Sequence, residues 1–148
     1  DEPVTHTVAS TFMRAYMTGQ AVARATATHL SVNLNIVERK FGYRFGTPNH
    51  DLDWAEDPPG GESMQEFIDR TRLGVLQACA LGPCPAIVAH GGNLRVIAAG
   101  LGTDLPDGSV GNATPLKFTR NGGKWVLEFV GGIAAVTSTA SASTTAVS

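Results

Sequence analysis

Apolar residues recur at three- and four-residue steps over residues 63–81, and this spacing predicts a helix. Ser63 and Glu66 have the S-x-x-E spacing of a capping box, which places the start of the helix there. Gly82 and Pro83 predict its end. The apolar side is expected to consist of Met64, Phe67, Ile68, Thr71, Val75, Leu76 and Cys79. The polar side is expected to carry Glu66, Asp69, Arg70 and Gln77.

The segments on either side predict strands that alternate with helices. Residues 10–30 are rich in helix formers, with Ser10 or Thr11 as the cap, and residues 31–37 alternate as a short strand. The continuous apolar run 86–89 is typical of a strand in a parallel sheet. A loop over 45–61, a helix over 93–101 and strands over 116–118 and 125–130 complete the expected elements. This order predicts an α/β fold around a mostly parallel sheet.

Length and composition limit the organisation and the partners. The 148 residues suit a single domain over 1–132, followed by a flexible, low-complexity tail over 133–148. A net charge of −2 without a Lys/Arg block argues against a nucleic-acid or anionic membrane partner. No segment is long enough to span a membrane. No secretory signal is visible in a chain that begins at Asp1, so the cytoplasm is favoured and the localisation otherwise stays open.

The cysteines and histidines do not form a metal-binding pattern. Cys79 and Cys84 are expected to be two free, buried thiols, with a disulfide as the alternative. Neither cysteine has a C-x-x-C partner. The histidines are scattered along the chain at His6, His29, His50 and His90.

Three positions carry candidate chemistry. His90 ends the apolar run, where ligands of parallel sheets bind, and Gly91 and Gly92 leave amides open to phosphate at the next helix start. Arg14 begins the first helix, and Glu38 follows a candidate strand, where it could donate a proton. Each has a structural alternative: a helix-capping histidine, a solvated surface arginine and an exposed carboxylate.

Four segments, taken in order, resemble motifs of the histidine phosphatase (phosphoglycerate-mutase-like) superfamily. Residues 10–18 are similar to S-x-x-x-R-A-x-x-T, and residues 38–46 to E-x-x-F-G-x-x-x-G. Residues 61–63 read G-E-S, and residues 87–95 are similar to the motif of the family's second histidine. With the closing strands, the resemblance extends from about residue 7 to residue 130.

The resemblance implies a three-layer α/β/α fold and phosphoryl transfer through a phosphohistidine. It implies that Arg14 and His90 bind the phosphoryl group, and that Glu38 is the proton donor. The amides of Gly91 and Gly92 are expected to bind the same group because of their place at the helix start. A small phosphorylated substrate or inorganic phosphate is then the partner, and no metal or organic cofactor is implied. We interpret Glu62, at the start of the capped helix, as structural.

The sequence departs from the family at the nucleophile. No Arg-His-Gly occurs, and the stretch before Arg14 is too short for a strand, that motif and a helix. We therefore expect that the first strand and the nucleophile are missing, that two strand edges are left unpaired, and that this chain alone is inactive or weak. The expected further partners are a missing N-terminal segment, which would carry the nucleophile, or a second copy of the chain in a homo-oligomer. The alternatives are a non-catalytic anion-binding or protein-interaction domain on the same scaffold, and an unrelated α/β domain.

Overall fold

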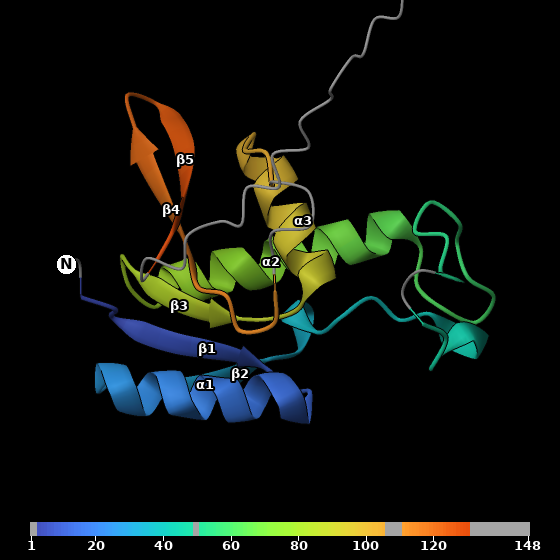
Figure 1. Ribbon diagram of the computed structural model, residues 1–148, viewed down its shortest axis with the longest axis horizontal. Helices are drawn as coiled ribbons and strands as arrows, with labels where there is room; N and C mark the ends of the chain where they lie inside the picture. The colour runs from blue at the N-terminus through green and yellow to red at the C-terminus, as the bar shows by residue number, and fades with distance from the viewer. Residues whose placement is uncertain (1–2, 49–50, 106–110, 131–148) are drawn as a thin grey trace, which may run out of the picture. The chain divides into compact units, whose positions relative to one another are not determined.

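The computed structural model of the protein describes residues 3–48, 51–105 and 111–130, and the chain divides into units over 1–104 and 105–148 (Figure 1). The elements of the first unit are β1 (His6–Ser10), α1 (Met13–Thr26), β2 (Leu30–Asn33), the 3-10 helices η1 (Leu34–Ile36) and η2 (Gly42–Arg44), α2 (Met64–Ala80), β3 (Pro85–Val88) and α3 (Gly91–Leu101). The second unit contains the antiparallel hairpin of β4 (Leu116–Asn121) and β5 (Lys124–Phe129).

The first unit is built on a parallel sheet in the order β2-β1-β3. The central strand β1 was not predicted, because only Val8 and Ala9 in it are apolar. Its polar residues Thr7 and Ser10 are buried and have hydrogen-bond partners distant in sequence: the Thr7 hydroxyl lies 2.6 Å from that of Thr28. Figure 1 shows the β1 and β3 arrows ending on the same side, where α1 and α3 begin. The predicted α/β fold with a parallel sheet is confirmed.

Helices cover both faces of this sheet and make three layers. On one face α1 lies so close that a Cβ added to Gly19 would be 2.7 Å from the Cβ of Ala9. On the other face Val8, Ile36 and Ala78 form a buried cluster, which joins β1 and η1 to α2. Alternate residues of β1 thus face opposite layers, as the two-residue period of a strand requires.

The predicted capping box of α2 is present. The Ser63 hydroxyl accepts a hydrogen bond from the Glu66 N–H at 3.2 Å, and the Glu66 carboxylate accepts one from the Ser63 N–H at 2.8 Å. The Ser63 hydroxyl also donates to the Glu66 carboxylate at 2.8 Å. The bonds from the Ser63 N–H and hydroxyl lower the pKa of the Glu66 carboxyl, because they stabilise its charged form.

The buried face of α2 differs from the prediction. It consists of Phe67, Thr71, Gly74 and Ala78, whereas Leu76 is 68% exposed. The small residues Gly74 and Ala78 on this face let α2 approach η1 closely. The helix is therefore rotated about its axis relative to the orientation that the sequence predicted. As a result Arg70, predicted on the polar side, turns inward.

The cysteines are free, as predicted, but not both buried. Cys79 is exposed on α2 because the helix presents its small residues to the core, and Cys84 is intermediate. Neither forms a disulfide.

Several boundaries also differ. The N-cap of α1 is Phe12, not Ser10 or Thr11, because Ser10 is the last residue of β1 and its hydroxyl accepts the Phe12 N–H. The strand β2 ends at Asn33, where the side chain caps η1, rather than continuing to Val37.

The other predicted elements lie close to their expected places. Helix α3 begins two residues before the prediction, and β4 continues to Asn121. The turn between β4 and β5 has positive φ at Gly122 and Gly123, as glycine permits. The tail predicted over 133–148 lies outside the described residues, so the predicted domain boundary stays a prediction. Every described helix is too short or too polar to cross a membrane.

Two glycines in helices test the packing of α2. A Cβ at Gly74 would lie 2.6 Å from the Ile36 Cγ2, whereas a Cβ at Gly100 on α3 would have no neighbour within 4 Å. We expect Gly74→Ala to destabilise the protein by about 1–3 kcal/mol through overpacking. Gly100→Ala should stabilise it by roughly 0.5–1 kcal/mol, because alanine restricts the unfolded chain. Urea unfolding measures both, and equal effects would contradict the close approach of α2 to η1.

Candidate functional site

His90 lies at the carboxyl edge of the sheet, beside the end of β1. It follows β3 and is the N-cap of α3. Because β1 and β3 are parallel and pair Ala9 with Val88, the two strands end at the same edge of the sheet. The Ser10 Oγ therefore lies 2.8 Å from the His90 Nε2.

Arg14 contacts the other ring nitrogen of this histidine. Its Nη2 lies 3.1 Å from the His90 Nδ1. A guanidinium can only donate hydrogen bonds, so Nδ1 must be the acceptor. The ring proton of neutral His90 is then on Nε2, where it donates to the Ser10 Oγ. These two contacts assign the tautomer.

This arrangement keeps His90 neutral near pH 7. Its pKa is lowered from 6.5 to about 4, first by burial and then by the positive charges of Arg14 and Arg70. A protonated ring would also lose the hydrogen bond from Arg14, because Nδ1 would carry a hydrogen. An anion bound beside His90 would offset the positive charges of Arg14 and Arg70 and so favour the protonated ring.

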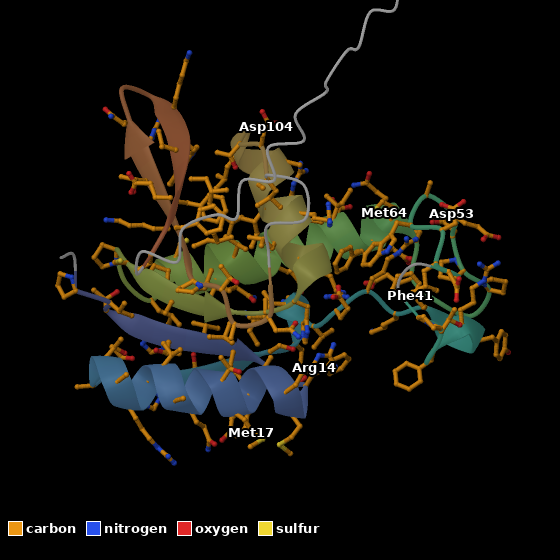
Figure 2. All side chains as sticks on the ribbon, viewed as in Figure 1. Arg14, Met17, Phe41, Asp53, Met64 and Asp104 are labelled. Atoms are coloured by element: carbon orange, nitrogen blue, oxygen red, sulfur yellow. The ribbon has the colours of Figure 1, made fainter. Side chains whose placement is uncertain are left out.

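Arg14 is available to bind such an anion. Its guanidinium lies over the Phe12 ring, 5.0 Å from the centroid, and the same ring contacts His90 edge-on at 5.2 Å. Within residues 3–48, 51–105 and 111–130, the other N–H groups of Arg14 have no protein acceptor. The side chain is exposed at the start of α1, and the view of Figure 2 shows Arg14 at that end of the helix.

Glu38 contacts the first turn of α3, which directly follows His90. One carboxylate oxygen accepts the Gly92 N–H at 3.4 Å, and the other accepts the Arg39 N–H at 3.1 Å. The Gly92 amide, predicted to bind phosphate, is therefore already used by Glu38. A Cβ at Gly92 would contact Glu38 and lie 2.9 Å from the Trp54 ring, whereas one at Gly91 would have no neighbour within 4 Å. Of these two glycines, Gly92 is required by close packing and Gly91 is not.

An ion pair fixes the backbone that carries Glu38. Arg70 binds both carboxylate oxygens of Glu62, at 2.5 and 2.7 Å. The same guanidinium donates to the backbone carbonyls of Asn35, Val37 and Glu38 at 2.8–3.0 Å. Glu62 is 8% exposed. We interpreted Glu62 as structural from its place at a helix start, and its contacts add a physical reason, the bidentate pair with Arg70.

A second arginine fixes the loop that follows. Arg39 is 3% exposed and donates to the carbonyls of Trp54, Glu56 and Glu62 at 2.6–3.2 Å. It also pairs with the Asp57 carboxylate at 3.3 Å. A buried guanidinium is tolerated because all of these acceptors converge on it. The loop beside Glu38 is therefore held at several points.

Sequence reasoning missed the roles of Ser10, Arg39 and Arg70. The signal for Ser10 was its position between a short strand and a helix start, which is where parallel sheets place ligand-binding groups. The roles of the two arginines depend on distant backbone carbonyls, and no local pattern predicts those partners. Within the described ranges, no three His, Cys, Asp or Glu side chains lie close enough together to hold a metal ion.

The family is decided by a match along most of the sequence. The sequence model of the family described as "Histidine phosphatase superfamily (branch 1)" matches residues 1–131. The chain belongs to the histidine phosphatase superfamily. It is also 29% identical over 126 residues to the agropine synthesis reductase of Rhizobium rhizogenes, covering 85% of this chain and 29% of that protein. The chain thus spans less than a third of the length of this curated relative.

Solved structures of a mycobacterial glucosyl-3-phosphoglycerate phosphatase have a similar fold. Its complex with inorganic phosphate has a TM-score of 0.66 and 24% identity, over 86% of this chain and 76% of that one. Its complex with VO3 has a TM-score of 0.60 and 25% identity, over 86% and 75%. The histidine phosphatase fold is therefore confirmed, whereas the catalytic roles of Arg14, Glu38 and His90 stay predictions.

The titration of His90 tests the geometry of this candidate site. Its imidazole signals should titrate with a midpoint near pH 4 in phosphate-free protein, and adding inorganic phosphate should raise the pKa because a nearby anion favours the imidazolium. Arg14→Met should raise the pKa of the free protein only partly, since burial is the larger cause. NMR of ring-labelled histidine measures each midpoint, with His90→Gln assigning the signal. A midpoint unchanged by phosphate would contradict an anion site at His90.

Proposed function

We propose that this chain binds the phosphoryl group and protonates the leaving alcohol in a histidine phosphatase site, where a phosphomonoester is hydrolysed or its phosphoryl group transferred. The observation that carries the proposal is the contact between Arg14, at the start of α1, and His90, which follows β3. The two side chains meet at the carboxyl edge of the sheet, and the N–H groups of Arg14 that do not bind His90 can donate hydrogen bonds to an anion.

Such a pair fits the main task of phosphoryl transfer. The transferred group spreads negative charge over its oxygens, and catalysis depends largely on donors positioned around them. Arg14 would bind two oxygens with its planar fork, and His90 would change from an acceptor toward Arg14 into a donor toward phosphate. The phosphate and vanadate complexes of the mycobacterial phosphatase of similar fold support this use of the scaffold.

The nucleophile would come from an Arg-His-Gly segment, which residues 1–148 do not contain. In the described part of the first unit, β3 pairs with β1 alone, so its other edge is open. A parallel strand on that edge would end beside His90, because parallel strands share their carboxyl edge. This placement would bring a histidine after the strand close to Arg14 and His90.

The proposed reaction has two steps. The nucleophilic imidazole nitrogen attacks phosphorus while the bond to the leaving oxygen breaks. That oxygen keeps the electron pair of the bond and takes a proton from Glu38. In the second step water attacks the phosphohistidine, gives a proton to Glu38, and phosphate and the free histidine result. An alcohol in place of water would give transfer.

The second candidate is a non-catalytic anion-binding or interaction domain. The observation that favours it is the sequence itself, which contains no Arg-His-Gly. Phosphate binding fits both candidates, whereas turnover through a phosphohistidine fits only the first.

Restoring the nucleophile tests the proposal. The 148-residue chain should hydrolyse 4-nitrophenyl phosphate weakly or not at all, because loss of a covalent nucleophile removes most of the rate. Fusing a strand that ends in Arg-His-Gly before Asp1 should produce turnover and an acid-labile phosphohistidine. Robust turnover by the unfused chain, with His90 unphosphorylated, would contradict the mechanism.

Two matched variants of the fused protein separate chemistry from structure. Glu38→Gln should lower kcat about 10²-fold for an alkyl phosphate, and less for 4-nitrophenyl phosphate, whose leaving group needs little protonation. Glu62→Gln should lower Tm, since Arg70 loses its charged partner, and should affect both esters alike. A larger and ester-dependent loss in Glu62→Gln would overturn the assignment of Glu38.

A further inference from the structure

A cavity of about 350 Å³ opens beside the first turns of α2 and α3. Its walls come from the loop before α2 and from these two helices, all within the first unit. The lining residues are Trp54, Met64, Phe67, Gly92, Arg95 and Val96.

The wall of this cavity is apolar and held in place. Trp54 lies 6.5 Å from the Phe67 ring and contacts the Phe41 ring edge-on at 5.0 Å. Its backbone carbonyl accepts a hydrogen bond from buried Arg39 at 2.6 Å. Phe67 is 1% exposed. A largely preformed apolar cavity is the typical environment for an apolar ligand.

Gly92 joins this cavity to the proposed site. Its N–H donates to Glu38, and a Cβ on it would lie 2.9 Å from the Trp54 Cη2. Glu38 and Trp54 therefore meet at the same glycine. A group attached to the oxygen that Glu38 protonates would extend from this point, where the cavity offers it space.

Arg95 adds a charge to the lining. It is exposed on α3, one turn after Gly92, and within the described residues its side chain has no hydrogen bond or ion pair. The other lining side chains are uncharged. An anionic substituent of the ligand would find its partner here.

We propose that this cavity binds the leaving group of the substrate, and that this group is an aromatic alcohol carrying a carboxylate. The inference rests on the proposed function, because it needs the phosphoryl group at Arg14 and His90. The ring would lie against Trp54, Phe67 and Val96, and the carboxylate would face Arg95.

Non-hydrolysable phosphonates test this inference on the chain as it is. Calorimetry should show phenylphosphonate binding at least roughly tenfold more tightly than methylphosphonate, since the ring buries apolar surface. 4-Carboxyphenylphosphonate should bind more tightly still. In Trp125→Phe, which leaves Trp54 as the single tryptophan, phenylphosphonate should quench the fluorescence and methylphosphonate should not.

Three variants isolate the cavity from the phosphate site. Trp54→Ala and the cavity-filling Val96→Phe should abolish the advantage of phenylphosphonate while methylphosphonate binding stays within about twofold. Arg95→Gln should remove only the gain from the carboxylate. Circular dichroism checks that each variant folds, and Val96→Phe decides the matter if Trp54→Ala does not fold.

The outcomes distinguish the two proposals. If inorganic phosphate and methylphosphonate bind but the phenyl group adds nothing, the cavity inference is overturned and the proposed function stands. If Arg95→Gln binds both aryl ligands as the unchanged chain does, the carboxylate part is overturned. If no phosphorus ligand binds, the proposed function fails and the inference fails with it.

Discussion

The parallel pairing of β1 with β3 is the constraint on which the site depends. Its register places the end of one strand beside the end of the other, so Ser10 reaches His90 across 80 residues of sequence. The helix that follows each strand then begins at the same edge, which gives Arg14 its contact with the ring. A shift of this register would move both Ser10 and Arg14 away from His90, because Ser10 ends β1, Arg14 lies in the helix that follows it, and His90 follows β3.

Two largely buried arginines extend this arrangement to Glu38. Arg70 holds the carbonyls that precede and include Glu38, and Arg39 holds the loop that carries Trp54. Both guanidinium groups are expensive to bury and would destabilise the fold if their acceptors were lost. Their many hydrogen bonds to backbone carbonyls and carboxylates hold the wall of the site in place, which suits a reaction that requires groups positioned before the phosphoryl group binds.

Much of this could be predicted from the sequence, and the limits have physical causes. The capping box at Ser63 and the apolar run before His90 are local signals, so α2, β3 and the fold class follow from them. The strand of β1 is short and half polar, and its identity depends on two neighbouring strands distant in sequence. The inward turn of Arg70 depends likewise on small residues of α2 packing against η1. The His90–Arg14 contact needed the structure, because 76 residues separate the pair.

Calorimetric titration with inorganic phosphate tests most directly whether Arg14 and His90 form the phosphoryl site. The unchanged chain should bind phosphate, and Arg14→Ala and His90→Ala should each weaken binding at least about tenfold, since a hydrogen bond to a charged group contributes ~1.5–3 kcal/mol. His29→Ala, at a histidine that contacts the His6 ring instead, should bind as the unchanged chain does. Equal losses in His29→Ala and His90→Ala, or full binding without Arg14, would contradict the account.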